Sequence, residues 1–455
     1  MANKEMNRRD FLQATGMLGV GLVGTSALLS SCGKKTANTP LREAGSYYVA
    51  EMPDKADNGK EIRIGLIGCG GRGNGAVSNA IAAADNVTVV ALADVCEDRL
   101  MEVVKNLKEQ YNIDIPEDKR FIGFDAYKKV LDSDINYAIL TTPPAFRAEQ
   151  YKYAVEKGVN CFLEKPIAVD AKTYRTAMAA AKQSQAKNLV TICGVQRHHE
   201  RPYVEAFQKI SEGMIGEITG GNVYWNDGML WYTNRQKGWS DMEWMIRDWV
   251  NWTWLSGDHI VEQHVHNIDV VLWMTGLKVK SATAVGSRQR RITGDQFDNF
   301  SVDFECENGV HFHSMCRQID GCSNGIGEII YGTKGSWNSF DHEIKDLNGN
   351  VIWKYDKEAD EKKFALHDPY TLEHVDGINH IRRGEGHDEA TGCAISCLAG
   401  IMGREAAYTG KTITWDEMSQ SEQSLVPENP QMGPMDMSKY KVPVPGEAQQ
   451  KFTDT

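Results

Sequence analysis

The chain has 455 residues, and 41% of them are hydrophobic, which predicts two sizeable domains rather than one. Its formal net charge is −12 and it carries no basic run, so binding to nucleic acid or to an anionic membrane surface is not expected. None of its ten cysteines forms a Cys-x-x-Cys pair, and their spacings predict no disulfide framework.

Residues 1–32 resemble an export signal. Arg8 and Arg9, followed by Phe-Leu, precede an apolar stretch at 17–29 that is too short for a comfortable transmembrane helix. The paired arginines resemble the twin-arginine type, which carries folded proteins across the inner membrane. The sequence Leu-Ser-Ser-Cys, ending at Cys32, resembles a lipobox. We therefore expect a periplasmic protein that is attached to the membrane only through a lipid on Cys32.

A predicted strand at 62–67 runs directly into a glycine-rich turn and a helix. Gly68 permits the tight turn, Gly70 lets the backbone approach a pyrophosphate, and Gly73 lets the helix pack closely on the strand. The amino end of the helix supplies NH groups and the positive end of its dipole. The residues of this turn that we expect to contact a dinucleotide are Gly68, Gly70, Gly71, Arg72 and Gly73.

A second β-branched strand, at 87–93, ends on Asp94. The order strand, glycine turn, helix, strand and acid is the one that a dinucleotide-binding Rossmann unit needs, and Asp94 stands where a carboxylate accepts hydrogen bonds from the adenosine ribose. No Arg or Lys follows it at once, since the next residues are Val95 and Cys96. NAD is therefore favoured over NADP, whose 2′-phosphate would meet an uncompensated negative charge.

Two later strand ends also point to the cofactor. The strand at 137–140 ends in Thr-Thr-Pro-Pro, so Thr142 and Pro143 are expected along the dinucleotide. The strand at 160–163 ends in Glu164-Lys165-Pro. A Lys at the tip of a buried parallel strand is poorly solvated, which suits Lys165 to orienting a hydroxyl or to proton transfer, although a strand-end Lys is more often a surface charge.

These motifs, with a later Glu-x-x-x-His helix, resemble the Gfo/Idh/MocA family of NAD(P)-dependent sugar and cyclitol oxidoreductases over about residues 60–418. The resemblance implies an α/β protein: an N-terminal Rossmann domain and a C-terminal α/β domain with a large, mostly antiparallel sheet that is often used for oligomerisation. We therefore expect a homodimer or homotetramer. Family members often carry His shortly after the Pro-Pro, whereas this chain has Arg147.

The second half of the chain alternates as antiparallel strands do, and an aromatic segment at 225–254 lies between them. Aromatic rings stack on the C–H faces of sugars while polar side chains bind their hydroxyls, so this segment predicts a carbohydrate-sized pocket, with core packing as the alternative for part of it. The candidate substrate residues are Arg197, Trp225, Asn226, Arg247, Asp248 and His259.

A predicted helix at 259–269 places His259, Glu262, His266 and Asp269 on one stripe. A carboxylate one turn before a His can accept its ring NH and raise its basicity, so Glu262 and His266 are the candidate catalytic pair beside Lys165. The family ordinarily has Asp in place of this Glu. A metal site is the alternative, with His311 and His313 as a second pair, but nothing in the sequence brings the two pairs together, and no metal is predicted.

Pattern and composition divide the chain into the following parts: signal 1–32, linker 33–59, Rossmann domain 60–187, substrate and oligomerisation domain 188–425, and C-terminal arm 426–455. The leading hypothesis is an oxidoreductase in which His266 removes a hydroxyl proton and Lys165 polarises the same oxygen. A redox-neutral glycosidase or lyase that uses NAD transiently, and a lipid-anchored sugar-binding protein, are the alternatives. Because an exported enzyme meets no free nicotinamide pool, we expect NAD to be tightly bound.

Overall fold

A computed structural model describes residues 40–43 and 45–446 of the protein. The predicted signal, the lipidation site Cys32 and the first part of the linker lie outside the described residues. In the part of the chain that is described, none of the helices has the length and apolar character needed to cross a bilayer.

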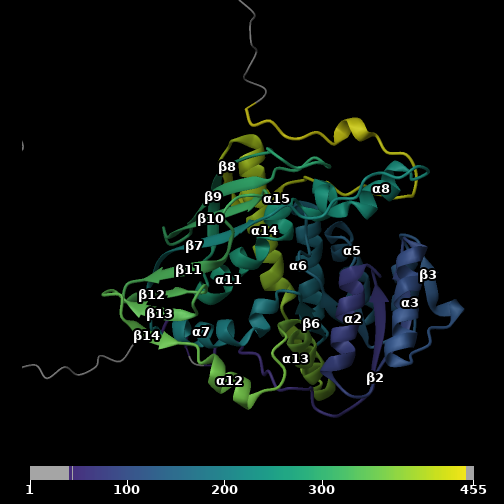
Figure 1. Cartoon of the computed structure of the whole chain (residues 1–455), viewed down its shortest axis with the longest axis horizontal. Helices are drawn as coiled ribbons and strands as arrows, with labels where there is room; N and C mark the ends of the chain where they lie inside the picture. The colour runs from purple at the N-terminus through teal and green to yellow at the C-terminus, as the bar shows by residue number, and fades with distance from the viewer. Residues whose placement is uncertain (1–39, 44, 447–455) are drawn as a thin grey trace, which may run out of the picture. The chain divides into compact units, whose positions relative to one another are not determined.

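The first layer is a parallel sheet of seven strands in the order β15-β6-β5-β4-β1-β2-β3 (Figure 1). The interior strand β1 carries Ile62, Ile64 and Leu66, which are all fully buried, as expected for a strand covered on both faces. The strands are β1 (Ile62–Ile67), β2 (Val87–Asp94), β3 (Arg120–Ile122), β4 (Tyr137–Leu140), β5 (Asn160–Leu163), β6 (Val190–Cys193) and β15 (His387–Asp388).

Helices cover both faces of this sheet. One face packs with the apolar sides of α2, α3 and α13, and the other packs with those of α4, α5 and α6. These helices are α2 (Gly71–Ala83), α3 (Glu97–Tyr111), α4 (Ala126–Leu131), α5 (Pro144–Lys157), α6 (Ala171–Ala186) and α13 (Pro369–Arg383).

The predicted domain boundary at residue 187 does not follow the sheets. The strand β6 pairs with β5, and β15 pairs with β6, so both belong to the first sheet although they follow residue 187. The helix α13 covers the same sheet through Val375 and Ile378. The chain therefore leaves the Rossmann layer, builds the second domain, and returns to complete the first.

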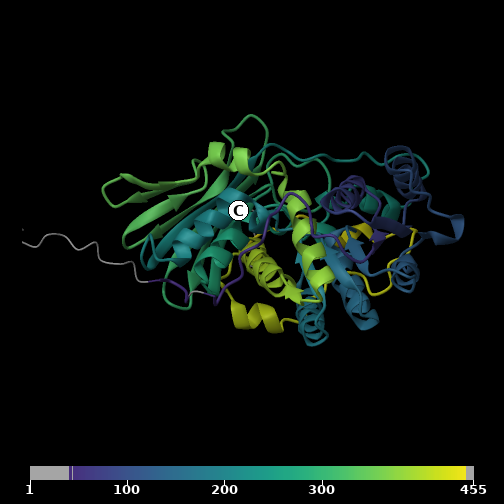
Figure 2. The same ribbon diagram turned by 90° about the horizontal axis from the view of Figure 1, so that it is seen from below.

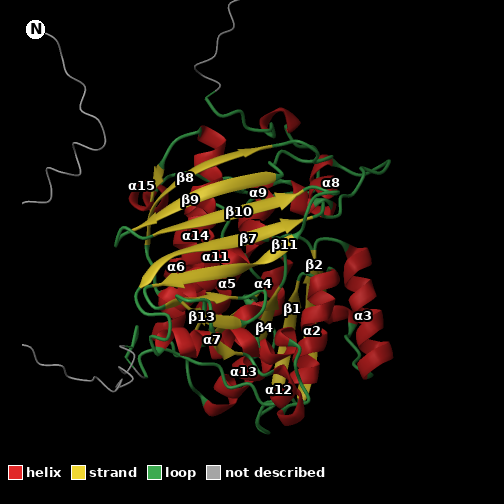
Figure 3. Ribbon diagram, turned by 60° about the vertical axis from the view of Figure 1, so that its left-hand side comes forward, coloured by secondary structure: helices red, strands yellow, loops and turns green. Residues whose placement is uncertain are grey.

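The second layer is a mixed, mostly antiparallel sheet of nine strands in the order β14-β13-β12-β11-β7-β10-β9-β8-β16, as the resemblance implied (Figure 3). Only the β7–β10 pair within it is parallel. The strands are β7 (Ile218–Asp227), β8 (Val279–Ser287), β9 (Asn299–Cys306), β10 (His311–Gln318), β11 (Gly325–Gly332), β12 (Gly335–Asn338), β13 (Glu343–Asp346), β14 (Val351–Lys354) and β16 (Ile413–Thr414).

One face of this sheet is packed with helices, and the other is open to solvent along β10, where buried and exposed residues alternate. The helix α14 lies between the two layers and contacts both α6 and β8 (Figure 2). The helices of this domain are α7 (Arg201–Ser211), α8 (Asp241–Arg247), α9 (Thr253–Ser256), α10 (His259–Glu262), α11 (Val265–Thr275), α12 (Lys357–Lys363), α14 (Ala390–Thr409) and α15 (Trp415–Gln420).

The glycine turn after β1 has the geometry that the sequence predicts. Gly68 has a φ of +97°, and a Cβ placed on it would lie 2.6 Å from the backbone N of Thr142. A Cβ on Gly73 would lie 1.9 Å from the carbonyl O of Gly68. A side chain at either position would therefore force the turn and the helix apart.

We predict that Gly73→Ala lowers the free energy of unfolding by about 2–4 kcal/mol, because the added methyl group meets backbone rather than a movable side chain. Gly75→Ala, on the same helix, is the matched control. Its Cβ would meet only Arg72, at an ordinary 3.5 Å, so this change should be neutral or stabilise by up to about 1 kcal/mol. Denaturant unfolding of the two variants measures the difference, and equal stabilities would contradict the prediction.

Candidate functional site

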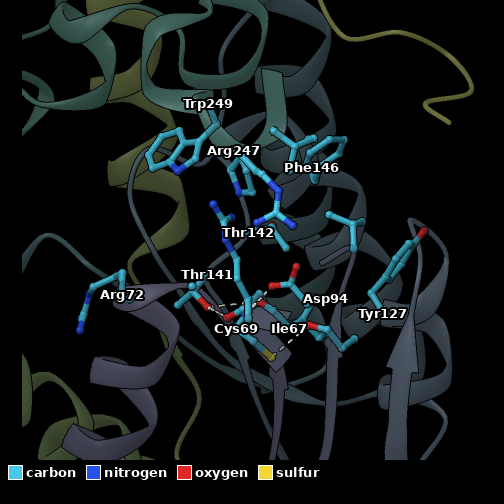
Figure 4. A pocket seen from close by; sticks show the side chains of 18 of the residues that line it. Ile67, Cys69, Arg72, Asp94, Tyr127, Thr141, Thr142, Phe146, Arg247 and Trp249 are labelled. Atoms are coloured by element: carbon cyan, nitrogen blue, oxygen red, sulfur yellow. Dashed lines mark hydrogen bonds between the residues drawn. The ribbon is translucent and has the colours of Figure 1, made fainter. Parts of the chain in front are cut away.

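A cavity of about 500 Å³ opens at the carboxyl ends of β1, β2 and β4, where a doubly wound sheet binds its ligands (Figure 4). The Rossmann domain supplies the glycine turn, Asp94 and the predicted residues Thr142 and Pro143. The second domain supplies the opposite wall, which consists of Trp231, Thr233, Ile246, Arg247 and Trp249.

The glycine turn can hold a pyrophosphate. Cβ atoms placed on Gly70 and Gly71 would meet no heavy atom within 4 Å, so the backbone is open to the cavity at both positions. The helix α2 begins there, and its amino end has neither a side-chain cap nor an acidic residue in its first turn. Its first NH groups are thus available to an anion, together with the positive end of the helix dipole. The residues present fit a dinucleotide.

Asp94 points into this cavity (Figure 4). Its carboxylate accepts hydrogen bonds from the backbone N of Cys69 at 2.6 Å and of Cys96 at 2.8 Å, which fix its orientation. Burial raises the pKa of Asp94, and these backbone donors and the charge of Arg99 oppose that rise. A carboxylate oxygen can accept a second hydrogen bond, so Asp94 can still bind a ribose hydroxyl.

Arg99 is a functional candidate that the sequence reasoning missed. It lines the same cavity from the first turn of α3, although the residues directly after Asp94 carry no charge. A helix that starts at the end of β2 brings its first turn back to the strand end, which is the signal that could have revealed it. The expectation that the negative charge of Asp94 is uncompensated is therefore wrong.

The predicted cofactor residues Arg72 and Glu164 bind each other. The Arg72 Nε donates to Glu164 Oε1, and its guanidinium lies 4.9 Å from the ring centre of Tyr370. In Figure 4 the Arg72 side chain turns away from Asp94. Only the backbone of Arg72 is thus offered to a phosphate, while its side chain joins α2 to the end of β5.

Lys165 forms a buried ion pair with Glu262. Its Nζ donates to the backbone O of Glu262 and, at 3.0 Å, to Glu262 Oε1, and the two side chains are 10% and 7% exposed. Glu262 therefore binds Lys165 instead of the ring of His266, which corrects the predicted pair. A lysine ammonium has three donors, so one remains for another acceptor.

The predicted helix at 259–269 is broken, which explains the correction. The helix α10 ends at Glu262 and α11 begins at Val265, so the expected stripe does not persist through the turn. Asp269 accepts from Ser396 and lies 2.7 Å from His198 Nε2 instead.

His266 is buried against Trp225, with their ring centres 5.7 Å apart and nearly parallel. Its Nδ1 has no hydrogen-bond partner among the described residues. Burial, followed by the positive charges of Lys165 and Arg197, holds the pKa of His266 well below its usual range. The imidazole is therefore neutral at pH 7 and able to accept a proton.

Two of the six candidate substrate residues, Trp225 and Arg197, lie close to His266. The guanidinium of Arg197 lies 5.8 Å from the ring centre of Trp225 and 3.6 Å from Glu328. Lys165, Glu262, His266, Trp225 and Arg197 are linked by these contacts and by the electrostatic effect of Lys165 on His266, and we call them the catalytic cluster.

The structure places the other four candidates elsewhere. The Asn226 amide contacts Met315 on the opposite face of the sheet, because neighbouring residues of a strand alternate. Asp248 is buried and accepts from the backbone N of Thr233 at 2.7 Å.

His259 lies against Asp258 and Phe300 in the core. Arg247 lines the dinucleotide cavity rather than the catalytic cluster.

His311 and His313 make ordinary contacts within the sheet. His311 Nδ1 lies 2.9 Å from Asp303, and His313 Nε2 lies 2.8 Å from the hydroxyl of Ser301. Within residues 40–43 and 45–446, no three His, Cys, Asp or Glu side chains are grouped so that they could hold a metal ion.

Arg147 positions the Glu-Lys-Pro loop. Its Nη1 donates to the carbonyl oxygens of Lys165 at 2.6 Å and Pro166 at 2.8 Å, across a cis Lys165–Pro166 bond. Burial lowers the pKa of Arg147 to about 10, so it stays charged at neutral pH. The sequence marked this position only as a departure from the family, and the partner carbonyls could not be read from it.

The parallel sheet, the open glycine turn and Asp94 define a Rossmann-fold dinucleotide-binding protein with a second, mixed-sheet domain. The chain belongs to the Gfo/Idh/MocA family. Residues 62–192 match the model for the oxidoreductase family with an NAD-binding Rossmann fold, and residues 203–338 match the model for the GFO/IDH/MocA C-terminal domain.

Solved structures share this fold at low sequence identity. The scyllo-inositol dehydrogenase of Lactobacillus casei with bound NAD(H) and scyllo-inositol is 20% identical, with a TM-score of 0.58 over 78% of this chain and 99% of that one. The myo-inositol 2-dehydrogenase of Lactobacillus plantarum is 19% identical, with a TM-score of 0.58 over 78% of this chain and 99% of that one.

Curated relatives carry glycosidase names. A glycosyl hydrolase family 109 protein of Shewanella pealeana is 27% identical over 229 residues, which are 50% of this chain and 47% of the relative. An alpha-N-acetylgalactosaminidase of Shewanella oneidensis is 24% identical over 228 residues, with the same shares covered. The chain thus spans about half the length of the curated relatives it matches.

We predict that Arg147→Met lowers the free energy of unfolding by about 2–3 kcal/mol, because two buried carbonyl oxygens lose charged donors. Arg147→Lys keeps the charge but not the forked geometry and should fall between Met and the wild type. Denaturant unfolding at neutral pH measures both variants. A Met variant as stable as the wild type would show that the loop is held by other contacts.

Proposed function

We propose that the protein is an NAD-dependent oxidoreductase that acts on a secondary hydroxyl of a sugar, glycoside or cyclitol. The observation that carries the proposal is the catalytic cluster, in which the charge of Lys165 at the end of β5 acts on a neutral His266 that is stacked beside Trp225 and whose Nδ1 has no hydrogen-bond partner among the described residues. Lys165 follows a strand whose carboxyl end lies on the same edge of the sheet as the glycine turn. Family membership supports the same class of reaction.

The bound cofactor supplies a hydride acceptor for the carbon that carries the reacting hydroxyl. His266 takes the hydroxyl proton, and its low pKa keeps the ring in the neutral form that this step needs. The free N–H of the Lys165 ammonium donates to the same oxygen and stabilises its developing negative charge. Trp225 offers its face to the apolar side of the ring, and Arg197 offers donors to other hydroxyls.

NAD is the proposed cofactor, with NADP the less favoured alternative. Asp94 offers a carboxylate to the ribose hydroxyls and would repel a 2′-phosphate. Arg99, on the same cavity, would weaken that repulsion without removing the carboxylate. Cofactor choice therefore depends on the balance of these two charges.

A redox-neutral glycosidase or lyase with a permanently bound NAD is the second candidate. The family 109 names of the curated relatives support it, and so does the predicted export signal at 1–32. In this version the protein is periplasmic and anchored through Cys32, and its cofactor does not exchange with a soluble pool. The open face of the nine-stranded sheet supports a homo-oligomer, a dimer or a tetramer.

We predict that NAD co-purifies with the protein. Denaturing a gel-filtered preparation and assaying the supernatant should release nicotinamide dinucleotide close to one per chain. The same preparation, given free sugars, cyclitols and N-acetylgalactosaminides, separates the two candidates: accumulation of reduced cofactor supports the oxidoreductase, and release of sugar without it supports the glycosidase. A cofactor-free preparation that is active only with added NAD would contradict the prediction that NAD is retained.

We also predict that the acid limb of kcat/KM lies below pH 6.5, because the base must be neutral and burial lowers its pKa. His266→Asn should reduce turnover by roughly 10²-fold and remove this limb. His311→Asn changes an exposed histidine outside the cluster and should leave the profile unchanged. An identical acid limb in His266→Asn and wild type would assign the base to another group.

A further inference from the structure

The second domain closes the outer side of the dinucleotide cavity. Trp231, Thr233, Ile246, Arg247 and Trp249 all belong to residues 228–252, which we call the wall segment. The wall segment also packs against the Rossmann domain, since Met245 and Trp252 share a hydrophobic cluster with Cys96. A dinucleotide lying along the glycine turn and Asp94 would therefore lie beneath the wall segment.

An ion pair fastens the wall segment to the Rossmann helix α3. The two terminal nitrogens of Arg247 each donate to one carboxylate oxygen of Asp98, at 2.9 Å. The Nε of Arg247 donates to Glu243 at 3.1 Å, and its guanidinium lies 4.9 Å from the ring centre of Trp239. Both contacts hold the guanidinium in place. Such a two-point pair has a fixed geometry, so separating α3 from the wall requires both bonds to break.

The C-terminal arm fastens the wall segment from outside (Figure 1). Directly before the arm, the backbone N of Leu425 donates to Asp170, the residue that caps α6 of the Rossmann domain, at 2.6 Å. Further along, the backbone N of Met435 donates to Asp241 at 2.9 Å, and Tyr440 packs edge-on against Trp252. The arm thus connects the two domains on the outer side of the cavity.

We propose that the Arg247–Asp98 pair and the C-terminal arm form a clasp that holds the wall segment closed and makes the dinucleotide leave slowly. The proposal rests on the retained cofactor of the proposed function and assigns the residues that retain it. Arg247 and Asp98 are then positioning residues for the cofactor site, and Arg247 has no direct part in substrate binding. Release requires the wall segment to move, so each contact of the clasp adds to the barrier.

Asp98→Asn tests the ion pair, because Asp98 does not itself line the cavity. Holoenzyme is diluted, sampled over time, filtered and denatured, and the dinucleotide left on the protein is measured. The variant should release it roughly threefold to fivefold faster than wild type, as expected for a partly exposed pair. Glu109→Gln removes a comparably exposed carboxylate on the same helix and should release at the wild-type rate.

The dependence of release on ionic strength distinguishes loss of the Arg247–Asp98 ion pair from a general loosening of α3. Raising the ionic strength should speed release from wild type, because it screens the pair, and should change Asp98→Asn much less. The arm is tested by ending the chain after Gln420, which should speed release at least tenfold. Tyr440→Ala is the milder variant, and a thermal unfolding curve for each confirms that it is folded.

Release from Asp98→Asn and from the arm variants at the wild-type rate would overturn the clasp. A wild-type preparation without dinucleotide would instead count against the retained cofactor. In that case NAD is added to the apoprotein, and its release is followed by the same filtration. The clasp still predicts faster release from Asp98→Asn than from Glu109→Gln, and equal rates would overturn it.

Discussion

The ammonium of Lys165 and the carboxylate of Glu262 meet where the two domains join, and the site depends on that contact. Neither charge is stable alone in so buried a place, because an unpaired buried ion loses its hydration without compensation. The pair therefore constrains the end of β5 and the break between α10 and α11 to lie together. That break places His266 against Trp225, and the positive charge of Lys165 helps to keep the imidazole neutral.

The nucleotide-binding half could be predicted because its requirements are local. Gly68 must adopt a positive φ and Gly73 must have no Cβ, and both demands appear in the sequence as glycine at fixed spacing. Asp94 follows from the same short unit. The mostly antiparallel pairing of the second sheet was also predictable, because one packed and one open face leave an alternating pattern along strands such as β9 and β10.

The catalytic half was predicted only in part, because its contacts join residues far apart in the chain. Lys165 and His266 were identified, but Glu262 was assigned to His266 on the assumption of one continuous helix. The carbonyl partners of Arg147 depend on the path of a loop that no spacing records. Asn226 was grouped with Trp225 although adjacent residues of a strand point to opposite faces. That last error was avoidable from the sequence alone.

The return of the chain to the first sheet constrains how the protein is made. Val375 and Ile378 of α13 share a hydrophobic cluster with Ile192, and α13 packs beside β5 and β6, so a nascent chain that has emerged only through the second domain still exposes that part of its Rossmann sheet. The nucleotide-binding layer is then completed almost last, although most of it is synthesised first. Any premature stop before residue 369 leaves that apolar surface uncovered, so fragments of this protein should be substrates for chaperones and proteases rather than stable Rossmann domains.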